Sequence, residues 1–128
     1  MTNIAIINIG TAGERQTGVT SLGCAMVNGF HAQGLTVPLF IAINQQMSKF
    51  MVQHRGLDPQ CVTWPRQIMK DPPQRVASLV VIDDCDRYNK KDLGQMLFSI
   101  RDCMSVFYCP CQIVLLRNPY NLKDLLPS

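Results

Sequence analysis

The chain has 128 residues, enough for one domain with its own core and too few for two. Hydrophobic residues make up 47% and charged residues 16%, against about 25% in an average domain, which excludes a disordered chain and suggests that a partner covers part of the surface. The net charge of +3 arises wholly within residues 49–75, a segment that fits either a solvated surface or contact with phosphate or nucleic acid.

The charges are unevenly distributed, because no Asp, Glu, Lys or Arg occurs from Gln16 through Ser48, a stretch of 33 residues. Polar residues and glycines interrupt this stretch, so it does not reach the roughly 18 consecutive apolar residues of a membrane-spanning helix. The first residues lack the basic region and the cleavage site of a signal peptide. We therefore expect a cytoplasmic protein with reduced cysteines and no membrane span.

The first elements are predicted from an apolar run and a glycine-rich loop. Residues 3–9 predict a strand that we expect to be buried. The loop over residues 10–18 leads into a helix predicted over residues 19–33, and Gly34 suits the left-handed cap that ends many helices. The apolar residues that keep i, i+3, i+4 spacing, as on one face of a helix, are Leu22, Ala25, Met26, Gly29 and Phe30.

The rest of the chain continues to alternate between strands and helices. Further strands are predicted over residues 37–43, 61–64, 79–82 and 112–116. One helix is predicted over residues 45–55, and a short helix is predicted in the tail. Asn89 should cap another helix, with Asp92 as its partner three residues on. The apolar stripe of that helix consists of Leu93, Met96, Leu97, Ile100 and Met104.

This alternation predicts a single α/β domain over residues 1–128, a three-layer sandwich with a mostly parallel sheet. In such sheets ligands bind at the carboxyl ends of the strands. The glycine-rich loop follows the first strand, and Asp83 and Asp84 follow the strand over residues 79–82. The sequence therefore brings both segments to the same edge of the sheet.

Residues 13–20 match the phosphate-loop pattern G-x-x-x-x-G-K-[ST] at every fixed position except the lysine, which is Val19. A second register begins at Gly10 and places Gln16 at the lysine position. In the first register backbone amides and hydroxyls would hold the phosphate groups, and an arginine is the candidate substitute for the lysine. The residues assigned to this binding are Gly13, Arg15, Gly18, Thr20 and Ser21. A glycine-rich turn that binds no ligand is the structural alternative.

The two aspartates after the apolar run at residues 79–82 resemble a Walker B segment. In that interpretation Asp83 holds a magnesium ion opposite the hydroxyl of Thr20. Asp84 or Asp86 then polarises the attacking water and is the catalytic residue. A strand that ends in Asp because Asp favours turns is the alternative.

Together these segments resemble a P-loop NTPase. Residues 79–86 and 112–119 are similar to the Walker B to sensor 1 section of DnaA-type replication initiators and helicase loaders, which are AAA+ ATPases that act on DNA. Residues 20–37 also resemble the first helix and second strand of ParA/MinD-type ATPases. The resemblance implies ATP and magnesium as ligands and places Asn118 near the sensor position.

Three functions fit this pattern. The first is a degenerate nucleotide site in an assembly or regulatory component of DNA-associated machinery. The second is a minimal magnesium-dependent ATPase that uses a substitute cation, and the third is a protein-binding module without a nucleotide. The helix over residues 19–33 shows no charged face, so we expect it to pack against a second copy or another protein. The segment over residues 49–75 is the candidate surface for nucleic acid.

Overall fold

The computed structural model describes residues 4–10, 18–34, 37–71, 77–105 and 111–126. Five strands form one parallel sheet in the order β1-β5-β4-β2-β3. The strands are β1 (Ile4–Ile9), β2 (Leu39–Ile41), β3 (Val62–Thr63), β4 (Leu79–Ile82) and β5 (Cys111–Leu116). The predicted α/β class and parallel sheet are confirmed, although β2 is shorter than predicted, since it begins only after Pro38 and ends at Ile41.

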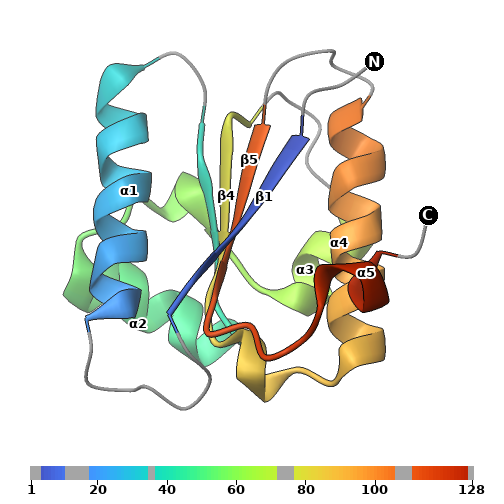
Figure 1. Ribbon diagram of the computed structural model, residues 1–128. Coiled ribbons are helices and arrows are strands. Elements are labelled where there is room, and N and C mark those ends of the chain that lie inside the picture. The colour runs from blue at the N-terminus through green and yellow to red at the C-terminus, as the bar shows by residue number, and fades with distance from the viewer. Residues whose placement is uncertain (1–3, 11–17, 35–36, 72–76, 106–110, 127–128) are drawn as a thin grey trace.

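Helices cover both faces of the sheet, with α1 and α2 on one side and α3, α4 and α5 on the other (Figure 1). The helices are α1 (Val19–Gln33), α2 (Gln45–Arg55), α3 (Pro65–Lys70), α4 (Lys90–Ser105) and α5 (Leu122–Leu125), with short 3-10 helices η1 (Pro59–Cys61) and η2 (Cys85–Arg87). The predicted bounds of α1 and α2 are confirmed. In the described ranges no helix is long and apolar enough to cross a membrane.

Local side-chain contacts explain where two of the long helices begin. Asn44 Oδ1 accepts a hydrogen bond from Met47 N at 2.9 Å at the start of α2. At the start of α4, Asn89 Oδ1 accepts from Asp92 N at 2.7 Å, and Asn89 Nδ2 donates to Asp92 Oδ2 at 3.0 Å. The predicted cap of α4 is thus confirmed, as is the left-handed Gly34 at the end of α1, with φ 72°.

The apolar stripe predicted for α4 forms the centre of one core. All five of its residues are buried, and they pack with Val80, Ile82, Ile113 and Leu115 of the sheet. Gly94 lies where α5 crosses α4, because a Cβ atom there would lie 2.8 Å from the carbonyl oxygen of Leu125. The α4 side of the sheet is therefore organised as the hydropathy pattern predicts.

The apolar face predicted for α1 is only partly confirmed, because Met26 and Phe30 are half-buried and pack against the core, whereas the other three residues do not. Leu22 is 47% exposed, and Ala25 and Gly29 are also exposed. The residues that α1 buries are Val19, Gly23, Cys24 and Val27. The reason is a close approach of the helix to the sheet, since a Cβ atom on Gly23 would lie 2.8 Å from Leu116 Cδ1. Small residues make this contact, so the hydropathy pattern does not reveal it.

The prediction that the first strand is buried is also wrong. β1 lies at the edge of the sheet, pairs with β5, and leaves Ile7 39% exposed. Helix α1 packs over β2, β4 and β5 and leaves β1 incompletely covered. By contrast, all four residues of β4 are buried, because β4 lies in the middle of the sheet with a core on each face.

Candidate functional site

A polar cluster lies at the carboxyl ends of β4 and β5, beside the first turn of α1. Asp83 and Asp84 follow β4, Arg117 follows β5, and Thr20 is the second residue of α1. The sheet order places β5 between β1 and β4, so Arg117 emerges between the strand that precedes the glycine-rich loop and the strand that precedes the aspartates. The structure thus brings Thr20 and Asp83 together, at the edge where parallel sheets bind ligands.

The guanidinium group of Arg117 occupies the centre of this cluster. Thr20 Oγ1 donates a hydrogen bond to Asp83 Oδ1 at 3.1 Å. Arg117 Nη1 donates to Thr20 Oγ1 at 3.0 Å, to Asp83 Oδ1 at 3.2 Å and to Asp84 Oδ1 at 3.4 Å. Arg117 is 3% exposed and Asp83 is 2% exposed. A buried cation therefore joins the hydroxyl of α1 to both carboxylates.

Backbone conformation sets this cluster apart from the rest of the described chain. Asp84 has φ 54° and Arg117 has φ 60°, and they are the two non-glycine residues with positive φ in the described ranges. Each such conformation is strained by about 1–3 kcal/mol unless the surroundings enforce it, and such strain concentrates at functional sites. The strain falls on two residues that contact each other at the ends of neighbouring strands.

The environment of Asp83 opposes its ionisation. Burial, followed by the nearby Asp84 carboxylate, raises the pKa of Asp83 above its usual value of 3.8. The hydrogen bond from Thr20 and the charge of Arg117 act in the opposite direction. The positive charge of Arg117 is thus directed at two neighbouring carboxylates.

The N-terminus of α1 differs from those of α2 and α4. Gly18 is the N-cap residue of α1, with φ 76°, and no described side chain accepts a hydrogen bond from the first-turn amides. The first turn of α1 contains no acidic residue, as in α2, whereas that of α4 contains Asp92. Amides that no described side chain caps, together with the helix dipole, favour an anion at this position.

A cavity of about 200 Å³ lies beside this helix terminus, between α1 and α2. Arg55, the last residue of α2, lines the cavity, and its Nη1 donates a hydrogen bond to Ser21 Oγ at 2.9 Å. The other residues that line it are Gly18, Thr20, Ser21, Met47, Phe50, Met51, Asp83, Asp84 and Arg117. The cavity is smaller than the roughly 300–1,000 Å³ of typical ligand pockets, so it suits a phosphate group better than a whole nucleotide.

The residues proposed for magnesium do not fit that ion as they are arranged. Magnesium requires oxygen ligands at about 2.0–2.1 Å in octahedral geometry. Arg117 Nη1 lies within 3.0–3.2 Å of the Thr20 and Asp83 oxygens that would have to coordinate the ion. Among the described side chains, His, Cys, Asp and Glu form no group of three or more that could hold a metal.

Val19, at the lysine position of the phosphate-loop pattern, belongs to the core. Its side chain is buried and packs against Gly10, where a Cβ atom would lie 2.8 Å from Val19 Cγ2. Gly10 also has φ 83°, which favours glycine. The position that holds the phosphate-binding lysine in the pattern is therefore occupied here by an apolar side chain, which packs the start of α1 against the end of β1.

The remaining predicted site residues have different positions. Gly13 and Arg15 lie outside the described residues. Asn118 holds the turn after β5, because its Nδ2 donates to Asn8 Oδ1 and to the Tyr120 carbonyl oxygen, both at 3.0 Å. Arg117 is not among the residues that the motifs predict for the site. One feature of the sequence could have indicated it: Arg117 directly follows an apolar strand, and parallel strands end at the same edge of a sheet, where Asp83 and Asp84 follow the neighbouring strand.

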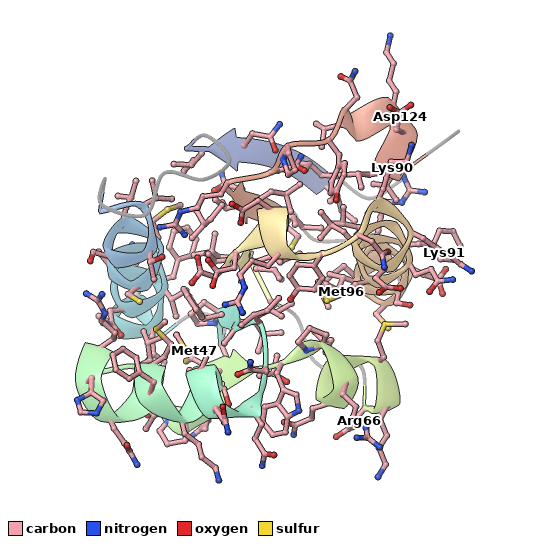
Figure 2. All side chains as sticks on the ribbon, turned by 90° about the horizontal axis from the view of Figure 1, so that it is seen from below. Met47, Arg66, Lys90, Lys91, Met96 and Asp124 are labelled. Carbon is pink, nitrogen blue, oxygen red and sulfur yellow. The ribbon has the colours of Figure 1, made fainter. Side chains whose placement is uncertain are left out.

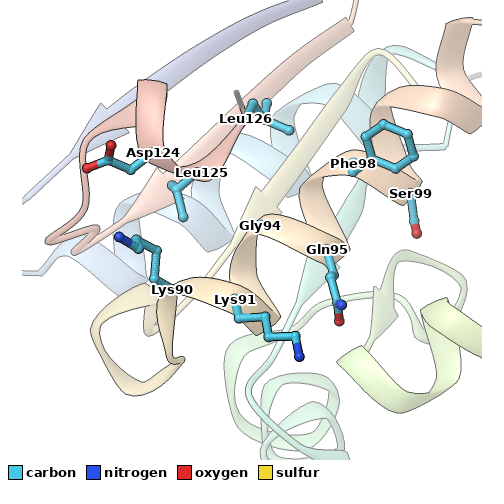
Figure 3. Close-up of a pocket in the computed structure, with 9 residues that line it drawn as sticks. All are labelled: Lys90, Lys91, Gly94, Gln95, Phe98, Ser99, Asp124, Leu125 and Leu126. Carbon is cyan, nitrogen blue, oxygen red and sulfur yellow. The ribbon is translucent and has the colours of Figure 1, made fainter. Parts of the chain in front are cut away.

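Two larger hollows lie on the α4 side of the sheet, away from the polar cluster. One, of about 440 Å³, lies between α3 and α4, where Arg66 and Met96 are labelled in Figure 2. The other, of about 520 Å³, lies between α4 and α5, and Figure 3 shows Lys90 and Phe98 of α4 along it. Neither includes a residue of the polar cluster.

Comparisons with protein-family models, with curated proteins and with solved structures find no match to this chain. The resemblance to P-loop NTPases therefore rests on the motifs alone. The architecture that is established is an α/β domain with a five-stranded parallel sheet flanked by helices.

Proposed function

We propose that this chain is a P-loop-like domain with a degenerate nucleotide site, which binds nucleotide phosphate groups without magnesium and acts as an assembly or regulatory component. In this proposal α1 is the side through which it assembles with a second copy or another protein. The resemblance to replication initiators is the basis for proposing that the chain acts in DNA-associated machinery. The exposed basic residues of segment 49–75, such as Lys49 and Arg66, are the candidate contacts with nucleic acid.

The observation that carries the proposal is the position of Arg117. Phosphoryl transfer needs cations that neutralise charge on the transferred group as the reaction proceeds. The charge of Arg117 is directed instead at Asp83 and Asp84, at 3.2 and 3.4 Å. Arg117 also donates hydrogen bonds to Thr20 and Asp83. These are the two residues that would bind magnesium in the resembled family, so their oxygens already have a partner within the protein. This arrangement favours a site that does not hydrolyse ATP.

Phosphate binding is supported by the other side of the same site. The first-turn amides of α1 have no cap among the described side chains, whereas asparagines cap α2 and α4. Arg55 and Ser21 lie next to these amides and border the cavity. Because Arg55 is exposed, its guanidinium group can turn toward a phosphate group entering from solvent.

The proposal is tested by titrating the purified protein with ATP, in magnesium and in EDTA, by calorimetry and thermal shift. We expect the same affinity and the same rise in Tm in both buffers, with no release of phosphate. Arg55→Ala should weaken binding several-fold, while Arg66→Ala, an exposed arginine on α3, should leave it unchanged.

Two outcomes would replace the proposal. If ATP produces neither heat nor a change in Tm, the protein-binding module without a nucleotide is the better description. If phosphate is released and the release disappears in Asp83→Ala, the protein is a minimal ATPase.

A further inference from the structure

The two edges of the sheet differ in how they are protected. The edge strand β3 has two residues and is followed by Trp64 and Pro65, and a proline soon after a strand limits further pairing. The other edge strand, β1, has six residues, none of them charged and none of them proline. Within the described residues no strand pairs with the outer edge of β1. Proteins usually cover or disrupt such an edge, because it can pair with another strand.

The hydrogen bonds of β1 show which backbone groups face outward. Arg117 N donates to the carbonyl oxygen of Ile9 at 3.0 Å, so Ile9 faces β5. Successive residues of a parallel strand direct their N–H and C=O groups to opposite sides. The groups of Ile4, Ile6 and Asn8 therefore point to the open edge, where an added strand would accept and donate hydrogen bonds.

An uncharged apolar strip borders this edge on the α1 side of the sheet. Ile7 is 39% exposed in β1, and Leu22 is 47% exposed in α1. Ser21 and Cys24 contact α2 through Arg55 and Met51, so Leu22 lies on the flank of α1 that faces away from α2. That flank is on the β1 side, because α2 lies toward β3 at the opposite edge.

We propose that a second copy of this chain pairs with β1 in antiparallel orientation, with the two Ile6 residues opposite each other and the two α1 helices on the same side of the joined sheet. Such a two-fold contact is self-complementary, and it matches each outward-facing residue of one β1 with an outward-facing residue of the other. The proposal names the partner in the assembly part of the proposed function and does not depend on nucleotide binding.

Charge favours a second copy at this edge. The two copies would meet through β1 and the neighbouring flank of α1. Neither β1 nor α1 contains an Asp, Glu, Lys or Arg residue. Among the described residues of the basic segment, Lys49 and Arg55 lie on α2, and Arg66 and Lys70 lie on α3, which follows β3 at the opposite edge. Two copies joined through β1 therefore keep their basic segments apart, whereas pairing through β3 would bring them together.

Sedimentation of the full chain over a range of concentrations, without nucleotide, tests the proposal. We expect a concentration-dependent dimer. Ile7→Lys and Leu22→Lys should each raise the dimer Kd at least tenfold, because each introduces a charge on both sides of the uncharged contact. The matched control is Phe98→Lys, at a 57% exposed position on α4, which should leave the dimer Kd unchanged.

Hydrogen exchange of the backbone amides tests the strand pairing itself. The amides of Ile6 and Asn8 should exchange more slowly as the protein concentration rises, while those of Ile7 and Ile9, which face β5, should not change. A chain that is monomeric at all concentrations, or a dimer without this alternation in β1, would overturn the inference. ATP binding by Ile7→Lys should equal that of the unaltered chain, which separates this test from the test of the nucleotide site.

Discussion

The two helical layers of this protein are held to the sheet in different ways. On the α4 side the buried residues are large and apolar, and they keep the helical spacing that the sequence displays. On the α1 side small residues contact the sheet, and polar contacts tie Thr20 to Asp83 and Arg117. Hydropathy therefore locates a helix face where large side chains are buried, and it fails where close backbone approach and charge position the helix.

The largest effect should come from breaking the polar cluster on the α1 side. Arg117→Met leaves Asp83 and Asp84 buried without this cation, so we expect it to lower the free energy of unfolding by about 3–5 kcal/mol in urea titrations. The control is Arg87→Met, since the pair of Arg87 with Asp84 at 3.9 Å involves an exposed arginine, and its loss should change stability by about 0–1 kcal/mol.

A double variant keeps this prediction testable if Arg117→Met fails to fold. Adding Asp83→Asn removes one of the uncompensated charges, so the double variant should be more stable than Arg117→Met alone. Equal losses for Arg87→Met and Arg117→Met would show that the buried ion pairs do not hold α1 to the sheet.

A smaller effect should distinguish the leucines of the two helices. Leu97→Ala empties a buried position in the α4 stripe and should lower the free energy of unfolding by about 2–5 kcal/mol. Leu22→Ala, on the exposed flank of α1, should change it by about 0.5 kcal/mol or less at concentrations where the protein is monomeric. Similar losses at both positions would mean that Leu22 is packed in the monomer.

Two glycines should respond in opposite directions to the same substitution. Gly94→Ala forces a Cβ atom to within 2.8 Å of the Leu125 carbonyl oxygen, and such overpacking is destabilising by about 1–3 kcal/mol, more than the helix propensity of alanine restores. Gly29→Ala meets no atom within 4 Å and should stabilise the protein by about 0.5–1 kcal/mol. Thermal unfolding of both variants measures the difference, and a stabilised Gly94→Ala would contradict the close contact of α4 with α5.

The smallest effect should appear in the pH dependence of stability. Because the pKa of Asp83 is raised on folding, the folded state binds more protons than the unfolded state above about pH 3.8. The stability from this group is therefore present below pH 3.8 and is lost as the pH rises through the folded pKa. Asp83→Asn should remove that loss, so its Tm relative to the unaltered chain should increase with pH. A difference that stays constant or falls would show that Arg117 outweighs burial.

The sequence by itself determined the local elements of this protein. It predicted the bounds of α1 and α2, the glycine that ends α1, the Asn89 cap and the α4 stripe, because each depends on residues close together in the chain. The parallel sheet followed from the alternation of strands and helices. The meeting of Thr20 with Asp83 also followed, because parallel strands end at one edge.

Only the tertiary structure decided which strand lies at the edge, which face α1 buries, and which residue occupies the centre of the site. The order β1-β5-β4 leaves the apolar β1 half-covered and brings Arg117 into contact with Thr20 and the two aspartates. No local pattern encodes that order, because it arises from packing among segments that are far apart in the chain. The same packing brings small residues of α1 against the sheet, and small residues leave a weak hydropathy signal.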